Sequence, residues 1–304
     1  MSWDRVQQLL GTENLALLQQ KQVGIVGLGS GGGYVALALA MCGVSRFVLI
    51  DPDKLSVQNI IRHVADKRYI DQPKVAAIKD LILHRNPSAQ VLAYQGRVEE
   101  HLKALLNIDL LIVGVDNEPT KYVINEFCLA QYLTAIYGGV YERGEGGDVV
   151  IIAPNQGPCY ACWAESLREE ISFSDVSDHQ SLDYGQVGPE GTLKAEPALW
   201  LDVVRVANTQ ANMALNILLQ GTSAYRELPS NTVIIANQWL EIAEGHHIPP
   251  FGVEWVNIPR NPDCLVCGTR TQLKSLENAL SLDELLKSEH TVRPSAQEEE
   301  QEDD

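Results

Sequence analysis

The chain reads KQVGIVGLGSGGGYVALALAMCGVSRFVLID from Lys21 to Asp51, and this stretch decides the fold. Its first part, Lys21 to Leu28, is an apolar, β-branched run that ends in glycines, which is typical of a buried parallel strand. Tyr34 to Gly43 is rich in alanine and leucine and closes on a glycine, so it predicts a helix. Arg46 to Asp51 predicts the next strand. The whole stretch therefore predicts a β-α-β unit.

The alternation continues beyond this unit. Further strands are expected at 91–94, 109–115 and 134–137, and helical patterns at 74–84 and 119–132 separate them. Strands that alternate with helices in this way predict an α/β protein with a doubly wound, mostly parallel sheet.

The pattern changes in the second half of the chain. The run GGDVVIIA at 146–153 and strands expected at 232–236 and 253–258 indicate an added antiparallel C-terminal portion. Residues 167–196 show no clear periodicity, whereas 197–220 predict one long helix. The apolar face of this helix is expected to include Leu199, Val203, Val206, Met213 and Ile217.

Composition and charge narrow the class of protein. The chain has 304 residues and a net charge of -17, with 40 acidic against 23 basic side chains, which argues against a broad nucleic-acid or anionic-membrane surface. It contains no apolar run of the roughly 18 to 20 residues that span a membrane, and its start lacks a secretory pattern, so we expect a cytoplasmic protein. The acidic end, Gln297 to Asp304, is expected to be disordered, with a partner-binding tail as the alternative.

The glycine loop is the first motif that carries chemistry. Gly27, Gly29 and Gly32 form G-x-G-x-x-G between a predicted strand and a predicted helix, where glycine lets the backbone approach phosphates. Asp51 ends the second strand and could bind the ribose hydroxyls of NAD or of ATP. The loop alone therefore leaves a dehydrogenase, an ATP-using enzyme and a turn without a ligand open.

Charged residues after Asp51 favour ATP. Arg62 and Lys74 follow the loop closely in the sequence, and a transfer that breaks a phosphoanhydride must neutralise charge that NAD chemistry does not create. Asp116 follows the strand DLLIVGV, where a carboxylate can hold Mg²⁺. Taken singly, Arg62 or Lys74 would be an exposed charge and Asp116 a helix N-cap. We also assign Asp53 and Asn59, from the same DPDKLSVQN segment, to the ATP site.

The motifs G-x-G-x-x-G, D-x-D, N-x-x-R, Q-P-K and D-N, in this order, resemble the ThiF, MoeB and HesA family, the bacterial relatives of ubiquitin-activating enzymes. The resemblance runs from about Asp4 to Gly268 and implies a Rossmann-like sheet, ATP and Mg²⁺. It assigns Asp51 to the ribose, Asp116 to the magnesium ion, and three residues to the phosphates: Asn59, Arg62 and Lys74.

The same resemblance implies a homodimer and a division of the chain. Arg5 resembles an arginine that reaches into the neighbouring subunit's ATP site, although a surface arginine is the alternative. Gly33 departs from the many members that have serine after the third glycine. We expect an adenylation domain at 1–268, whose parts are a nucleotide-binding half at about 1–153, a crossover loop at about 163–196 and a C-terminal portion at 197–268, followed by an extension at 269–304.

Four cysteines form a second constellation. Cys159 and Cys162 make one C-x-x-C pair in a proline-containing turn, and Cys264 and Cys267 make another. Four soft thiolates suit tetrahedral Zn²⁺, so we predict a closed structural zinc site, a feature that the family resemblance also implies. Disulfides are disfavoured in a cytoplasmic chain, and a redox pair would not explain two motifs.

The remaining cysteines bear on the reaction. Cys42 and Cys128 fall in predicted helices as small apolar residues, and no cysteine occurs between Cys162 and Cys264. The family resemblance implies adenylation of a carboxylate, the C-terminal glycine of a ubiquitin-like or sulfur-carrier-like protein. In family members that form a thioester the cysteine lies between the two zinc pairs, so the resemblance also implies that no thioester forms on this chain. A peptide or RNA-linked carboxylate, an NAD-dependent oxidoreductase and a noncatalytic scaffold are the alternatives.

Overall fold

The computed structural model describes residues 2–170 and 198–269, without the side chains of 168–170. The chain divides into two compact units, Met1–Arg260 and Asn261–Asp304. The acidic end and most of the expected crossover loop lie outside the described residues.

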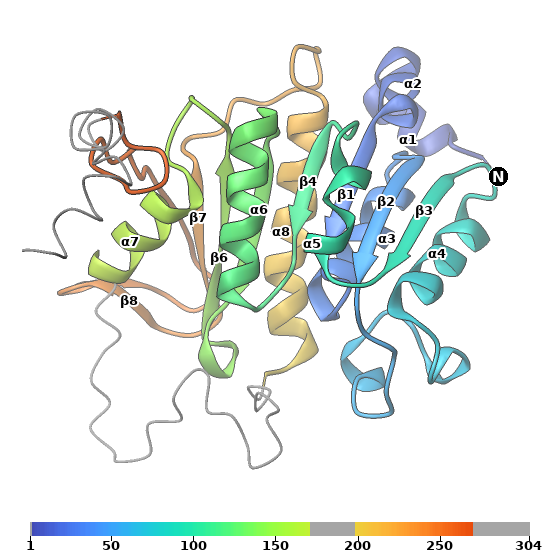
Figure 1. Ribbon diagram of the computed structural model, residues 1–304, viewed down its shortest axis with the longest axis horizontal. Coiled ribbons are helices and arrows are strands. Elements are labelled where there is room, and N and C mark those ends of the chain that lie inside the picture. Colours follow the sequence, from blue (N-terminus) through green and yellow to red (C-terminus); the bar gives the residue numbers. More distant parts are fainter. Residues whose placement is uncertain (1, 171–197, 270–304) are drawn as a thin grey trace, which may run out of the picture. The chain divides into compact units, whose positions relative to one another are not determined.

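An eight-stranded sheet forms the centre of the first unit (Figure 1), in the order β10-β7-β6-β5-β4-β1-β2-β3. The strands β3, β2, β1, β4 and β5 are parallel, whereas β6, β7 and β10 join antiparallel at one side. This arrangement confirms the predicted doubly wound sheet with an antiparallel addition. The strands are β1 (Gln22–Val26), β2 (Arg46–Asp51), β3 (Gln90–Gln95), β4 (Leu110–Val113), β5 (Ala135–Val140), β6 (Gly146–Ile152), β7 (Thr232–Ala236) and β10 (Val253–Val256).

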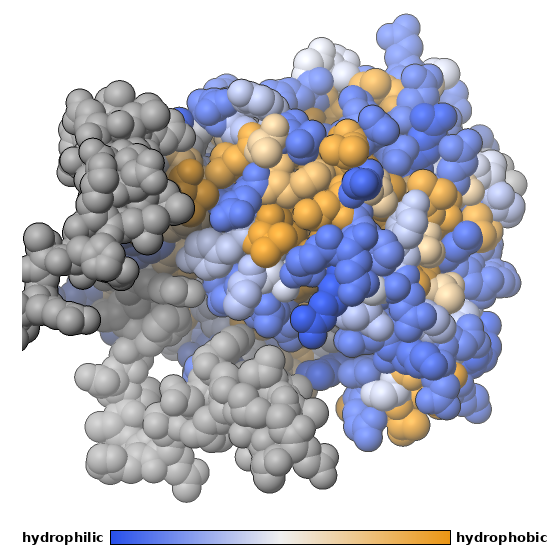
Figure 2. Space-filling view, in the orientation of Figure 1, coloured by the Kyte–Doolittle hydropathy of each residue, from blue (hydrophilic) through white to orange (hydrophobic). Residues whose placement is uncertain are grey.

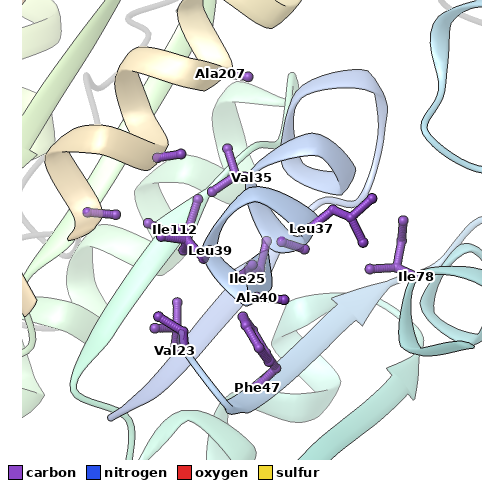
Figure 3. Close-up of a cluster of buried hydrophobic side chains, with 14 of the residues drawn as sticks. Val23, Ile25, Val35, Leu37, Leu39, Ala40, Phe47, Ile78, Ile112 and Ala207 are labelled. Carbon is purple, nitrogen blue, oxygen red and sulfur yellow. The ribbon is translucent and has the colours of Figure 1, made fainter. Parts of the chain in front are cut away.

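The central strands are buried on both faces, which explains their continuous apolar sequences. Successive side chains of a strand point to opposite faces, so Val23 and Ile25 of β1 join one hydrophobic cluster and Val26 joins the other. Figure 3 shows the first cluster, in which Phe47 of β2 packs with Ile25. Each such fully buried side chain stabilises the fold by roughly 1.5–3 kcal/mol.

Helices cover the two faces. The first cluster includes side chains of α3, α4 and α8, and the second includes side chains of α5, α6 and α7. On the face shown in Figure 2, apolar residues gather where α5 and α6 lie. The helices are α1 (Asp4–Leu10), α2 (Thr12–Gln20), α3 (Ser30–Met41), α4 (Lys74–Arg85), α5 (Val98–His101), α6 (Glu118–Gln131), α7 (Tyr160–Glu170) and α8 (Trp200–Leu218).

Some elements differ from the sequence pattern. Helix α7 begins inside the first C-x-x-C motif, where a turn was expected, and a hairpin of β8 (Leu240–Ala243) and β9 (His246–Ile248) was not predicted. Leu199 precedes α8 as its N-cap and is 69% exposed, so its predicted place on the buried face is wrong. Val206 and Met213 are buried as predicted.

The described part of the chain contains no helix that is both long enough and apolar enough to cross a membrane.

Candidate functional site

The glycine loop lies between β1 and α3, at the edge where the strand order reverses between β1 and β4. Gly27 has a φ of +84°, and a Cβ atom there would lie 2.6 Å from the carbonyl oxygen of Gly114. A Cβ atom at Gly32 would lie 1.9 Å from the carbonyl oxygen of Gly27, whereas one at Gly29 would meet no atom within 4 Å. Two glycines thus allow tight backbone packing, and the third borders open space.

The start of α3 is suited to an anion. Its N-cap residue, Gly29, has no side chain that could accept a hydrogen bond from the first turn. The N–H groups of that turn are therefore left to other partners. The positive end of the helix dipole adds to this preference for negative charge. The phosphates of a nucleotide fit this position.

Asp51 is tied directly to the glycine loop. Its Oδ2 accepts the Leu28 N–H at 2.6 Å, and its Oδ1 accepts the Asp53 N–H at 2.8 Å. The side chain is buried at the end of β2, and this burial raises the pKa of Asp51, although Lys74 and the two N–H groups oppose the shift. A carboxylate oxygen carries two lone pairs, so Asp51 can still accept a ribose hydroxyl.

Lys74 begins α4 and turns back towards the loop that follows β2. Its Nζ lies 2.7 Å from Oδ2 of Asp53, and its backbone N–H donates to the Asp53 carbonyl at 2.9 Å. The lysine side chain is only 11% exposed, whereas that of Asp53 is 62% exposed. The structure therefore places a mostly buried cation beside the loop that follows β2. Its partner, Asp53, is exposed, so water or a phosphate can replace it.

Asn59 and Arg62 lie in the segment between Asp53 and α4. Asn59 Oδ1 accepts the Ser56 hydroxyl at 2.7 Å, which holds this segment in a turn. Arg62 ends the 3₁₀ turn Ile60–Arg62 and is half-buried. No hydrogen bond among the described residues joins the side chains of Asn59 and Arg62 to Asp51, Asp53 or Lys74, so their place on the phosphates stays a prediction.

Asp116 follows β4, and its side chain is exposed. The alternative interpretation as a helix N-cap does not apply, because Asn117 is the N-cap of α6 and its Oδ1 accepts the Thr120 N–H at 3.0 Å. The Asp116 carboxylate is thus left for another partner. Gly114, between β4 and Asp116, packs against Gly27, which brings this strand end to the glycine loop.

Arg5 lies in α1, and its side chain is exposed. This position is compatible with both interpretations of the residue, a surface arginine and one that reaches a second subunit.

The two cysteine pairs belong to different compact units. In the first unit, Cys159 and Cys162 are buried at the start of α7 with their sulfur atoms 3.7 Å apart. In the second unit, Cys264 and Cys267 are buried in a tight turn, where the Gly268 N–H donates to the Cys264 carbonyl at 2.8 Å. Each pair offers two buried thiols on a short segment, an arrangement of the kind that binds zinc.

Cys42 and Cys128 lie outside the candidate site. Cys42 is the C-cap residue of α3, and Cys128 lies within α6. Burial raises the pKa of Cys42, and it raises the pKa of Cys128 to about 12. Both therefore stay protonated at neutral pH, and neither has the thiolate character of a nucleophile.

Two further polar residues support the site, and sequence reasoning missed them. His63 Nε2 lies 2.8 Å from the Leu28 carbonyl oxygen, in the middle of the glycine loop. Gln210 of α8 is buried, and its side-chain amide donates to two backbone carbonyls. One belongs to Val113, the last residue of β4, and the other to Ile136 in β5. The only sequence signals are a histidine directly after Arg62 and a glutamine on an apolar helix face.

The antiparallel portion contains a buried acid. Asp148 of β6 is hydrogen-bonded to Tyr141, and burial raises its pKa to about 7. A buried carboxyl of this kind titrates near neutral pH and links the stability of the fold to pH.

Asp148 gives a testable pH dependence. Since its pKa is raised in the folded state, its contribution to stability is present below about pH 4 and is lost as the pH rises towards about 7. The free energy of unfolding of the wild type minus that of Asp148→Asn should therefore fall between pH 5 and pH 8, by up to about 4 kcal/mol over the whole titration. Urea denaturation at several pH values measures it, and parallel curves for the two proteins would contradict the assignment.

Comparison with known proteins identifies the family of the chain. The model of the ThiF family matches residues 4–264. The chain belongs to the ThiF family. This result confirms the resemblance carried by the glycine loop and the motifs after Asp51.

Several relatives of the chain are adenylyltransferases by name. The chain is 33% identical over 194 residues to the sulfur carrier protein ThiS adenylyltransferase of Escherichia coli K12, a match that covers 60% of this chain and 73% of the relative. It is 30% identical over 155 residues to the adenylyltransferase and sulfurtransferase MOCS3-1 of Zea mays, covering 50% of this chain. The match spans only 33% of that maize protein, so the chain corresponds to about a third of it.

A solved structure shares the fold. The E. coli MccB structure with ATP superposes with a TM-score of 0.62 over 84% of this chain and 69% of MccB, at 18% identity. At this identity the likeness shows the fold alone, and it agrees with the mostly parallel sheet described above.

Proposed function

We propose that this chain adenylates a carboxylate with ATP and Mg²⁺, in the cytoplasm. A carboxylate oxygen attacks the α-phosphorus, a P–O bond to it forms, and the bond between the α-phosphorus and the bridging oxygen breaks. Pyrophosphate leaves with that electron pair, and an acyl-adenylate remains. The chain's part in this reaction is to position the nucleotide and to stabilise the charge that develops.

One observation carries the proposal: a mostly buried lysine, Lys74, pairs with Asp53 and lies near enough to Asp51 to lower its pKa, while Asp51 itself is hydrogen-bonded to the glycine loop. A dehydrogenase has no phosphate bond to break and gains nothing from a cation there. In an adenylating site, Lys74 would exchange Asp53 for a phosphate oxygen, and its low exposure would strengthen the interaction. Asp51 would hold the ribose, and Gly29 would admit the phosphates.

Asp116 would hold the Mg²⁺ ion. Its exposed carboxylate is a hard oxygen ligand that does not cap α6, and Mg²⁺ is commonly bound by one or two carboxylates together with phosphates. When bound, the ion supplies positive charge to the phosphate oxygens. Arg62 and Asn59 would complete the phosphate contacts.

The favoured substrate is the C-terminal glycine of a ubiquitin-like or sulfur-carrier-like protein. Support comes from the names of relatives, which include ThiS adenylyltransferase and ubiquitin-like modifier-activating enzyme 5. We further propose that this chain forms no thioester. No cysteine lies between Cys162 and Cys264, and the thiols of Cys42 and Cys128 are protonated.

ATP–pyrophosphate exchange tests the proposed function. Labelled pyrophosphate should enter ATP only when the cognate carboxylate and Mg²⁺ are both present, so the assay compares a small carrier ending in Gly-Gly with the same carrier lacking its last glycine. Exchange supported by a free peptide instead would change the substrate class, and exchange with no carboxylate would oppose the reaction. A thiol-sensitive adduct of the chain with the carrier would refute the absence of a thioester.

We also propose that the four cysteines bind one zinc ion. Cys159 and Cys162 are buried in the first unit, and Cys264 and Cys267 are buried in the second. Four thiolates satisfy the tetrahedral preference of Zn²⁺ and leave no ligand position for catalysis. The ion would then connect residues about a hundred positions apart in the chain.

Metal analysis tests the zinc proposal. The purified chain should contain zinc in a ratio near one to one, and Cys159→Ser should lower both the zinc content and the melting temperature, because binding energy at a structural site contributes to folding. Cys42→Ser is the matched control, since Cys42 belongs to neither pair. Unchanged zinc in Cys159→Ser would exclude that ligand.

A homodimer with shared sites is the last part of the proposal. Arg5 is exposed on α1, where it is available to a second subunit. Arg5→Ala and Lys74→Ala should each be inactive alone, whereas a mixture of the two that has exchanged subunits should regain activity in the exchange assay. Such complementation requires sites built from two chains, and a monomeric mass in solution would contradict it.

A further inference from the structure

Leu28, the residue between the first two loop glycines, is held at both of its backbone groups by side chains. Its N–H donates to Asp51 at 2.6 Å, and its carbonyl oxygen lies 2.8 Å from Nε2 of His63. These side chains come from different segments, the end of β2 and the residue after the 3₁₀ turn Ile60–Arg62. The middle of the loop is therefore clamped from both directions.

The hydrogen bonds of His63 determine its protonation. Nδ1 accepts the Ala65 N–H at 3.0 Å, so Nδ1 carries no proton and Nε2–H donates to Leu28. The ring is therefore neutral. Burial lowers the pKa of His63, Lys74 lowers it further, and the Leu28 carbonyl and Asp51 oppose the shift. A proton on Nδ1 would face the Ala65 N–H and disrupt this arrangement.

Gly33 provides the space for the imidazole. A Cβ atom at Gly33 would lie 3.3 Å from Nε2 of His63 and 3.4 Å from the Leu28 carbonyl oxygen. These contacts are tight, so a side chain at Gly33 would push the ring away from Leu28. The position of the His63 ring thus depends on the lack of a side chain at Gly33, near the start of α3.

We propose that His63 is a positioning residue for adenylation, which fixes the glycine loop through Leu28 and joins to it the segment that carries Asn59 and Arg62. The inference rests on the proposed function and extends it. Since Arg62 directly precedes His63, the same hydrogen bond that sets the loop also limits where the arginine can go. The glycine loop and Arg62 are then in position before ATP binds, which lowers the entropy cost of the reaction.

Direct nucleotide binding tests this proposal apart from the reaction. The affinity of the full-length chain for Mg-ATP, measured by calorimetry without any carboxylate substrate, should fall about tenfold in His63→Ala, as expected for a lost buried hydrogen bond. His63→Gln, which keeps an amide N–H donor, should regain part of this loss. Equal affinities of His63→Ala and the wild type at pH 7.5 would overturn the proposal, whereas absence of exchange with every carboxylate would bear only on the proposed function.

A pH profile separates positioning from general stabilisation. Because burial lowers the pKa of His63, the affinity of the wild type for Mg-ATP should weaken only at a pH below the ordinary histidine range, as His63 takes up a proton, relative to His63→Gln, which has no such group. The ratio of the two affinities removes the titration of ATP itself. A ratio that stays constant down to the lowest pH at which both proteins remain folded would contradict the role of the neutral ring.

Gly33→Ala provides a double-mutant cycle. This change should weaken Mg-ATP binding in the wild type, because the new methyl group crowds His63, and it should cost less in the His63→Ala background, where only the contacts with Ile78 and the Leu28 carbonyl remain. Equal losses in both backgrounds would show that Gly33 acts independently of His63 and would overturn this part of the inference. Melting temperatures of all four proteins identify any variant that fails to fold.

Discussion

Replacing Lys74 with alanine should lower the rate of ATP–pyrophosphate exchange by on the order of a hundredfold or more, because a preorganised charge in a partly dry site is removed. The lysine is 11% exposed and 2.7 Å from Asp53, so its ammonium group is already held in place before the substrate binds. The loss should appear mainly in kcat, since the charge on the phosphates is greatest as they separate.

Two further variants make this test specific. Asp53→Asn removes the partner and keeps the cation, so it should retain far more activity than Lys74→Ala if the phosphate replaces Asp53. Lys21→Ala is the matched control: Lys21 pairs with Asp109 at 2.8 Å, but both precede their strands, at the opposite edge of the sheet. Exchange by Lys74→Ala at a rate near that of Lys21→Ala would remove Lys74 from the mechanism.

The sequence predicts the central sheet well, because its strands are buried on both faces. Runs such as Val23 to Val26 and Phe47 to Ile50 have no polar residue, and burial on two faces favours this apolar composition. The hairpin of β8 and β9 is different. Its strands are short and carry exposed residues such as His246 and His247, so no period stands out.

Helix α7 shows another limit of sequence reasoning. The residues before it, with Pro158 and Cys159, have the composition of a turn, and a C-x-x-C motif is compatible with both a turn and the first turn of a helix. The buried aromatic side chains of Tyr160 and Trp163 decide for the helix, because they pack into the second hydrophobic cluster. That packing depends on residues from distant strands, which local sequence does not contain.

Residues that would touch the nucleotide are easier to predict than those that support them. Gly27, Asp51 and Lys74 stand in motifs with fixed spacing, and the structure joins each of them to the loop or to its flanking segment. His63 and Gln210 bond to backbone carbonyls 35 or more residues away. A backbone partner leaves no mark on the sequence, so these contacts become visible only in three dimensions.

Replacing Asp51 with alanine should abolish measurable Mg-ATP binding and destabilise the fold by about 2–4 kcal/mol, the cost of leaving one buried and one partly buried N–H group without an acceptor. The affected groups are the N–H of Leu28 and that of Asp53, which Asp51 accepts at 2.6 and 2.8 Å. Both lie in segments that line the candidate site, so the loop would lose the contact that sets its shape as well as the ribose ligand.

Asp109→Ala is the matched control for this variant. Asp109 also accepts a backbone N–H at a strand end, that of Gln22 at 2.7 Å, but its side chain is 35% exposed, so water can replace it. Its loss should cost no more than about 1 kcal/mol and leave ATP binding intact. Urea denaturation and calorimetry on both variants measure the two effects.

Asp51→Asn then separates the charge from the shape of the side chain. Burial raises the pKa of Asp51, so its ionised form is a net cost to the fold as the pH rises, and the neutral amide avoids that cost. However, the amide has only one acceptor oxygen, so one of the two N–H groups would face an NH₂ donor. We therefore expect Asp51→Asn to be more stable than Asp51→Ala and still deficient in ATP binding. Wild-type affinity in Asp51→Asn would show that the carboxylate charge has no part in holding the nucleotide.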